Sequence, residues 1–423
     1  MFNFWYETSY NNIIANNLVK EEYLQTLFDF KQIKDIQTPH IRLKANLPKF
    51  LSTVGIDFNI KNSASIPYTG IDKNTKNFFP VELSVFSKAG WKHDIFSCDA
   101  FIYRWLESSN TEILIWYPNE GFWTATWPYF DALMEKWPNN KIRFVFGNLQ
   151  RPKWADKTNN LIYKSFDFFW YDQQLQPRPV LDINKQEIYD FTFYNRRYKM
   201  HRALPYFSLL SKGKLRKAKH SFLGIVGNSI IDDHNAALQS IIQNYYETEE
   251  KYCGKGNAEH EGLIHSPEFF DWSLERIMNP DETIVDSTLY LHDQILHSES
   301  YLDLVAETWA FNRSDHLFIT EKTYRSIANG NIFLILGNPG TLHYLKSKGI
   351  ETFNDLFDES YDSRSYTHWF DRWKIIEKNI DRWRNMGIEG RTDYYKKNFE
   401  KIRHNQDVLF SRSFKNDVEE ILS

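Results

Sequence analysis

The residues from Asn195 to Arg202 combine amide and cationic side chains that could bind a phosphorylated ligand. They lie between a stretch with the apolar pattern of a strand and a stretch with the pattern of a helix. Guanidinium groups pair with phosphate oxygens, and the free backbone amides at a helix start point toward the same anion. We therefore expect Asn195, Arg197 and Arg202 to contribute to a diphosphate site.

A wider basic window surrounds these residues. Nine Lys and Arg residues lie between positions 196 and 219, with no Asp or Glu among them, while the whole chain has a formal charge of −4. The remainder of the chain is therefore −13, which excludes a uniformly basic coat for nucleic acid but leaves room for a local patch. The alternative interpretation is a solvated basic face.

A second group of candidates is Glu307 with Thr320, Glu321 and Lys322. Glu307 closes a predicted strand, and Thr320 is the predicted N-cap of a helix that begins at Glu321. Carboxylates can accept hydrogen bonds from ribose hydroxyls, and Lys322 beside them would neutralise phosphate. In the alternative interpretation, Glu321 is a first-turn acid that favours the helix dipole, and Lys322 is a surface residue.

Both halves of the chain show strands alternating with helices. Strands are predicted at 112–117 and 142–146, around a helix at 129–137; further strands are predicted at 189–194, 221–226, 301–306 and 331–336, with helices at 200–210 and 321–328. This alternation favours parallel sheets covered by helices, with ligands at the carboxyl ends of the strands. The sequence therefore predicts two α/β domains followed by a helical segment.

The helical segment begins at about residue 368. Trp369, Trp373 and Trp383 share one helical face, which predicts core packing; the alternative is a stacking role on nucleic acid. Two cysteines exclude a disulfide framework, and neither a secretory signal nor a long apolar run is found, so we expect a cytoplasmic protein without a membrane partner.

Three segments, 305–308, 318–325 and 328–337, resemble the nucleotide-sugar half of GT-B glycosyltransferases. They are especially similar to the α1,3-fucosyltransferase type, in which a Glu-containing strand precedes a Thr-Glu-Lys helix and a glycine-containing strand. Residues 340–362 resemble a branch encoded by many bacteriophages, in which an Asn-Arg-Arg…His-Arg segment also occurs. The resemblance covers about a quarter of the chain.

The resemblance implies a GT-B architecture, in which two Rossmann-like domains face each other across a cleft. We expect an acceptor-binding domain at 1–180, a nucleotide-sugar domain at 181–395, and a C-terminal helix at 396–423 that could return to the first domain. It also implies that Lys322 and either Arg197 or Arg202 hold the diphosphate. Glu321 or Glu307 would take the ribose.

An inverting transferase needs a carboxylate or histidine that accepts the proton of the acceptor hydroxyl. Glu120 follows a predicted strand, among aromatic residues that could stack on an acceptor ring. His93, Asp94 and Asp99 are rival candidates, and in the alternative interpretation Glu120 is a loop acid bonded to backbone. We expect no metal and no cofactor, because Arg and Lys can stabilise the leaving group.

The predicted function is transfer of a sugar from a nucleoside diphosphate sugar to an acceptor hydroxyl. The phage-like branch suggests a hydroxymethylated pyrimidine of phage DNA, such as hydroxymethylcytosine, as the acceptor, with the base flipped out of the duplex or met in a single strand. Host cytoplasm would then be the site of action. The alternatives are a fucosyltransferase-like enzyme acting on a glycan or protein, and a non-catalytic nucleotide-sugar or nucleic-acid binding module.

Overall fold

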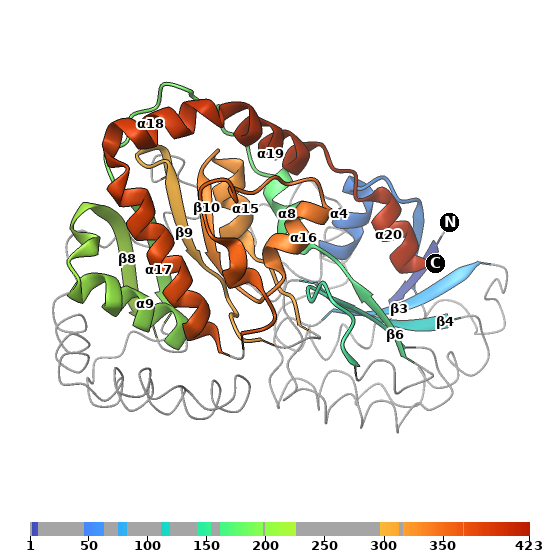
Figure 1. Ribbon diagram of the computed structural model, residues 1–423. Helices are drawn as coiled ribbons and strands as arrows, with labels where there is room; N and C mark the ends of the chain where they lie inside the picture. The colour runs from blue at the N-terminus through green and yellow to red at the C-terminus, as the bar shows by residue number, and fades with distance from the viewer. Residues whose placement is uncertain are drawn as a thin grey trace. The chain divides into compact units, whose positions relative to one another are not determined.

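The computed structural model describes residues 2–6, 46–62, 75–82, 111–118, 142–153, 161–197, 199–225, 297–312, 316–366 and 368–423 (Figure 1). The chain divides into two compact units. Unit 1 comprises Met1–Phe168 together with Ser413–Ser423, and unit 2 comprises Phe169–Arg412.

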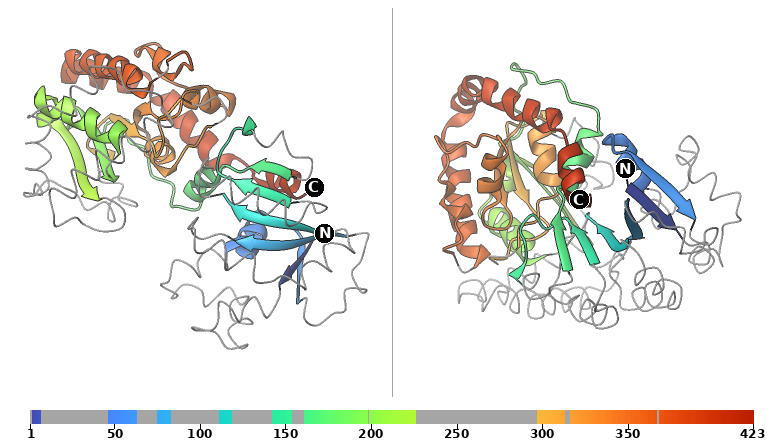
Figure 2. Two further views of the ribbon diagram at one scale, coloured as in Figure 1. Left: turned by 90° about the horizontal axis from the view of Figure 1, so that it is seen from below. Right: turned by 90° about the vertical axis from the view of Figure 1, so that its right-hand side faces the viewer.

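Unit 1 contains a six-stranded sheet in the order β2-β1-β3-β4-β5-β6. Its strands are β1 (Phe2–Tyr6), β2 (Phe58–Asn62), β3 (Lys76–Glu82), β4 (Thr111–Tyr117), β5 (Ile142–Phe146) and β6 (Leu161–Ser165). Every neighbouring pair is parallel (Figure 2). The strands predicted at 112–117 and 142–146 are thus confirmed as β4 and β5. The helix predicted at 129–137 lies outside the described residues.

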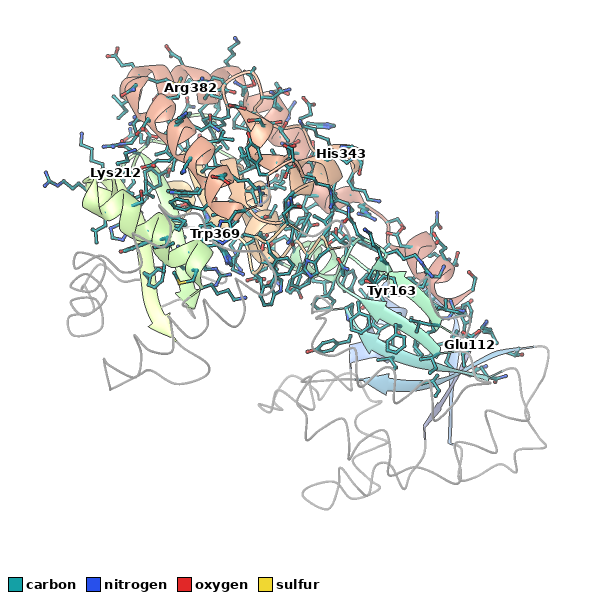
Figure 3. All side chains as sticks on the ribbon, turned by 60° about the horizontal axis from the view of Figure 1, so that its bottom comes forward. Glu112, Tyr163, Lys212, His343, Trp369 and Arg382 are labelled. Carbon is teal, nitrogen blue, oxygen red and sulfur yellow. The ribbon has the colours of Figure 1, made fainter. Side chains whose placement is uncertain are left out.

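Helices α4 (Asn46–Thr53) and α20 (Lys415–Leu422) also belong to unit 1. Phe50 of α4 packs against the rings of Trp116 and Phe166 in the core. A buried ion pair, between Arg143 Nε and Glu112 at 2.8 Å, lies on β5 and β4 (Figure 3). Arg143 Nη1 also donates to the Ile421 carbonyl of α20, so the last helix is anchored on this sheet.

Unit 2 contains a four-stranded parallel sheet in the order β10-β9-β7-β8. The strands are β7 (Phe191–Arg197), β8 (Ala218–Ile225), β9 (Leu302–Ala306) and β10 (Ile332–Leu336). The helices that connect neighbouring strands are α9 (Met200–Ser211) and α15 (Glu321–Ala328). Two α/β units, each built around a parallel sheet, confirm the predicted fold class.

The other helices in the described part of unit 2 are mostly C-terminal. They are α8 (Phe168–Gln174), α16 (Thr341–Ser347), α17 (Trp369–Asn385), α18 (Gly387–Lys397) and α19 (Phe399–Ser411), with 3₁₀ turns η6 (Lys214–Lys217) and η8 (Glu359–Asp362). Figure 1 shows α17, α18 and α19 following one another around this unit, and α17 packs on β10 and α9. Trp369, Trp373 and Trp383 are at most 1% exposed. The predicted core role of these tryptophans is confirmed.

Two strands differ from their predicted bounds. β7 extends to Arg197 rather than ending at residue 194, because its pairing with β8 continues through an irregularity between Asn195 and Arg197. β8 begins at Ala218, which pairs with Phe191, so the basic residues Lys217 and Lys219 flank the start of a strand. Among the described residues, no helix combines the length and apolar character needed to cross a membrane.

Candidate functional site

The carboxyl edge of the unit 2 sheet contains a topological switch point. β7 connects through α9 to β8 on one side, and β9 connects through α15 to β10 on the other side. Because parallel crossovers are right-handed, these opposite steps place α9 and α15 on opposite faces of the sheet. Open α/β sheets bind their ligands outside the carboxyl ends of the strands at such a switch point, which here means β7 and β9.

Glu307 follows β9 at this edge, and its side chain is fully buried. Oε1 accepts hydrogen bonds from the Thr320 amide at 3.1 Å and from Thr323 Oγ1 at 2.6 Å. Oε2 accepts from Thr320 Oγ1 at 2.5 Å and from the Thr308 amide at 3.1 Å. A carboxylate offers about four lone-pair sites, so protein donors fill this one. Glu307 therefore joins the end of β9 to the start of α15, with no lone pair left for a ribose hydroxyl.

The main-chain carbonyl of Glu307 is also engaged. Arg202 donates to it from Nη2 at 2.9 Å and from Nε at 3.3 Å, and His201 Nε2 lies 2.8 Å from the same oxygen. Arg202 is 3% exposed. The structure thus brings Arg202 next to Glu307, but the guanidinium faces the main-chain carbonyl that follows β9 and not the carboxylate.

The start of α15 lies at the same edge and has no side-chain cap. Thr320 is the N-cap, but its hydroxyl donates to Glu307 instead of capping the helix. The first-turn amides therefore have no side-chain cap, and such amides attract anions. The Lys322 ammonium lies beside them, 3.2 Å from Thr320 Oγ1 and 2.6 Å from Glu321 Oε1.

Glu321 keeps its charge over the whole physiological range. Burial by itself would raise the pKa of this carboxyl, but the Lys322 ammonium, its hydrogen bond and the nearby Arg325 outweigh burial and hold the pKa at about 2. Its side chain is 26% exposed. Glu321 is thus an ionised acceptor at the edge, partly open to solvent.

Lys199 is a cation of this edge that the sequence analysis did not single out. It precedes α9, and its ammonium donates to the Thr308 carbonyl at 2.7 Å and lies 3.5 Å from the centre of the Trp309 ring. Thr308 in turn donates to Glu307. The position of Lys199 between Arg197 and Arg202, directly before the predicted helix, was the signal in the sequence that could have identified this residue.

Asn338 fixes the loops around the site. It follows β10, is fully buried, and accepts from the Phe318 amide at 3.1 Å while donating to the Phe311 carbonyl at 3.0 Å. His316 Nδ1 lies 3.3 Å from the same side-chain oxygen. Asn338 thereby ties the loop after β9 and the approach to α15 to the end of β10.

Three lysines of the basic window are paired with carboxylates and so are not free cations. Lys212 and Lys214 pair with Glu377 of α17, and Lys214 also pairs with Asp381. Lys219 pairs with Glu299. Figure 3 shows Lys212 at the outer end of α9. These pairs favour a structural role for this part of the window, in which helix α17 supplies the compensating acids.

Several predicted site residues remain untested by the geometry. Asn195 is buried in β7, and no described residue gives its amide a hydrogen bond. Arg197 ends β7. The catalytic candidates Glu120, His93 and Asp94, and the rival Asp99, lie outside the described residues. Within the described ranges, no three His, Cys, Asp or Glu side chains are grouped as a metal site would require.

Comparisons with known proteins give a distant likeness of fold. No protein-family model matches the chain, and no curated protein matches it. T4 phage BGT in complex with UDP and Mn²⁺ is 11% identical over 100% of both chains, with a TM-score of 0.41. T4 phage BGT with its UDP-glucose substrate is 12% identical over 99% of this chain and 100% of the other, with a TM-score of 0.34.

An α,α-trehalose-phosphate synthase (UDP-forming) from Burkholderia vietnamiensis is 10% identical over 97% of this chain and 80% of the other, with a TM-score of 0.31. At TM-scores below 0.5 these likenesses do not identify the activity of the chain. We therefore infer the activity from the site residues of unit 2.

Proposed function

We propose that the chain is a GT-B glycosyltransferase that binds a nucleoside diphosphate sugar at the carboxyl edge of the unit 2 sheet. The observation that carries this proposal is the convergence of an uncapped helix start, the Lys322 ammonium and the partly exposed Glu321 carboxylate at the topological switch point. The Thr-Glu-Lys segment also carries the resemblance to this class of enzyme. Geometry and sequence therefore favour the same residues.

In this proposal the diphosphate lies against the start of α15. Lys322 and the first-turn amides neutralise its charge, which also stabilises the nucleotide as a leaving group. Because Arg202 is buried against the Glu307 carbonyl, we assign the guanidinium contact to Arg197. We keep Asn195, whose side-chain amide has no hydrogen-bond partner among the described residues, as a further contact to the donor.

We assign the ribose contact to Glu321 rather than to Glu307. Protein donors already fill both carboxylate oxygens of Glu307. Glu321 is ionised and partly exposed, so its carboxylate can accept a hydrogen bond from a ribose hydroxyl. Glu307 instead holds Thr320, and with it the helix start, in place.

For the acceptor, we propose a hydroxymethylated pyrimidine in DNA, with Glu120, His93 or Asp94 as the base that takes the hydroxyl proton. The phage-like segments, 195–202 and 340–362, support this choice. Because the chain has a net charge of −4, we expect few phosphate contacts. We propose inverting transfer without a metal, since cations at the edge can stabilise the leaving group.

The donor is tested by measuring the melting temperature with UDP-, GDP-, dTDP- and CMP-linked sugars. A ligand that binds the folded chain raises the melting temperature by mass action, so one nucleotide class should stand out. The acceptor is tested by incubating the bound donor with hydroxymethylated and unmodified DNA of the same sequence. Sugar transfer to a glycan or protein alone would replace the DNA acceptor with the fucosyltransferase-like alternative.

Catalysis is tested separately from binding. An enzyme of this kind slowly releases free sugar and nucleoside diphosphate from its donor, and this release should disappear in Lys322→Ala. Donor binding without any release or transfer would favour a binding module.

A further inference from the structure

Arg372 is a fully buried cation in the first turn of α17. Its guanidinium donates to three main-chain carbonyls: Nε to Tyr361 at 2.5 Å, and Nη1 to Ala310 at 3.0 Å and Gly337 at 2.6 Å. Among the described residues, no carboxylate hydrogen-bonds to it; Asp362 acts on it through charge alone. Burial lowers its pKa to about 10, so the group is charged at neutral pH.

The three carbonyls belong to segments that surround the proposed donor site. Ala310 lies in the loop after Glu307, and Gly337 directly follows β10. Tyr361 lies in η8, whose last residue, Asp362, accepts from the Gly340 and His343 amides. One guanidinium therefore ties the loops after β9 and β10 to each other and to η8.

Gly337 is also in close contact with Glu307. A Cβ atom added at Gly337 would lie 3.2 Å from Glu307 Cγ and 3.2 Å from Thr341 Oγ1. The Gly337 backbone therefore lies close to the side chain of Glu307, whose carboxylate holds Thr320, and the Glu307 amide donates to the Leu336 carbonyl at 2.9 Å. Arg372 is in this way coupled to the start of α15 through Gly337 and Glu307.

A gain in folding stability does not by itself explain a buried arginine at position 372. Taking a guanidinium out of water is costly, and an apolar side chain of similar size often fills a buried site at least as well. The planar fork of arginine reaches carbonyls in several directions at once, which a lysine ammonium on a flexible stem does not. The arrangement suits a group that fixes the relative positions of loops.

We propose that Arg372 is a positioning residue for the donor site, acting through the loops 307–312 and 337–340 and not through contact with the substrate. This inference rests on the proposed function. The inference predicts that the two loops lose their fixed spacing when the Arg372 guanidinium is removed. Lys322 and Glu321 would then no longer be held in a single arrangement toward the donor. Binding should suffer more than the chemical step once the donor is bound.

The test compares Arg372→Lys and Arg372→Met with Arg382→Met. Arg382 lies toward the other end of the same helix and donates to one exposed carbonyl, that of Leu356, at 2.6 Å (Figure 3). The probe is the nucleotide sugar that raises the melting temperature of the wild-type chain. Its KM for slow hydrolysis should rise on the order of ten- to a hundredfold in both Arg372 variants, with kcat at saturation changed much less, and should stay unchanged in Arg382→Met.

The outcomes separate the two proposals. If no nucleotide sugar binds the wild-type chain, the proposed function is wrong. If the wild-type chain binds its donor and Arg372→Lys binds it equally well, the positioning role is wrong and the proposed function stands.

If both Arg372 variants unfold, amide hydrogen exchange in the wild-type chain decides the matter. Donor binding should slow exchange in 307–312 and 337–340 together. Slowing confined to the start of α15 would overturn the inference.

Discussion

Glu307 and Thr320 are joined twice, once through the Thr320 amide to Oε1 and once through the Thr320 hydroxyl to Oε2. The first residue directly follows the central strand β9, and the second is the N-cap of the helix that carries Lys322. This double link makes a buried carboxylate the support of the proposed phosphate site. Glu307 and Glu321 are both carboxylates near the helix start, but the double link gives them different roles. Glu307 holds the site together, whereas Glu321 is partly exposed and open to a ligand.

Glu307→Gln should be strongly destabilising. Each carboxylate oxygen accepts from one backbone amide and one threonine hydroxyl. The hydroxyl can turn and accept from an amide NH₂, but whichever oxygen is replaced, one buried backbone N–H then faces another donor. We expect a loss of about 1–3 kcal/mol in the free energy of unfolding, measured by denaturant titration. The exposed Glu389→Gln is the matched control and should change it by less than about 0.5 kcal/mol. Equal stability of the two variants would contradict the account of Glu307.

Thr320→Val and Thr323→Val should differ in their effect on donor binding. Both lose a hydroxyl that donates to Glu307, so each should lower the free energy of unfolding by about 1–2 kcal/mol. Thr320 also accepts from Lys322, and its amide lies at the helix start. We therefore expect weaker donor binding by calorimetry in Thr320→Val and nearly normal binding in Thr323→Val. The reverse order would place the donor elsewhere.

Glu187 should make stability fall as the pH rises. Its carboxyl bonds to Arg391 Nε at 2.7 Å, but burial outweighs this cation and raises its pKa from 4.5 to about 7. The folded chain therefore binds this proton more tightly than the unfolded chain, and the stability contributed is lost between about pH 4.5 and pH 7.

Denaturant titrations at pH 5, 6, 7 and 8 measure this effect. The wild-type free energy of unfolding should fall by roughly 1–3 kcal/mol more than that of Glu187→Gln, which stays neutral and can still accept from Arg391. Glu389→Gln should keep the wild-type slope. Parallel curves for the wild-type chain and Glu187→Gln would contradict the assignment.

The sequence located the edge of the sheet well, because position along the chain determines which residues follow a strand. Glu307 follows a predicted strand, Thr320 precedes a predicted helix and Lys322 lies in its first turn, and the structure places the three together. The tryptophans of α17 were predictable for the same kind of reason, since their helical spacing puts them on one face.

What the sequence could not reveal is the direction in which a side chain faces once several segments meet. Arg202 and Glu307 looked like ligand contacts from their types and spacing, but the groups that engage them lie far away in the chain or in the backbone. Glu377, which pairs with Lys212 and Lys214, lies more than a hundred residues after them. Arg372 showed no motif at all, because its partners are carbonyl groups that every residue has.

The most direct test of the donor site is the melting temperature of the wild-type chain and Lys322→Ala, each with a series of nucleotide sugars. Lys346→Ala, which removes an exposed lysine paired with Glu359, is the control. We predict that one nucleotide class raises the melting temperature of the wild-type and control chains, and that Lys322→Ala weakens its affinity by about tenfold or more. An undiminished shift in Lys322→Ala, or no shift with any nucleotide sugar in the wild-type chain, would contradict a donor site at the start of α15.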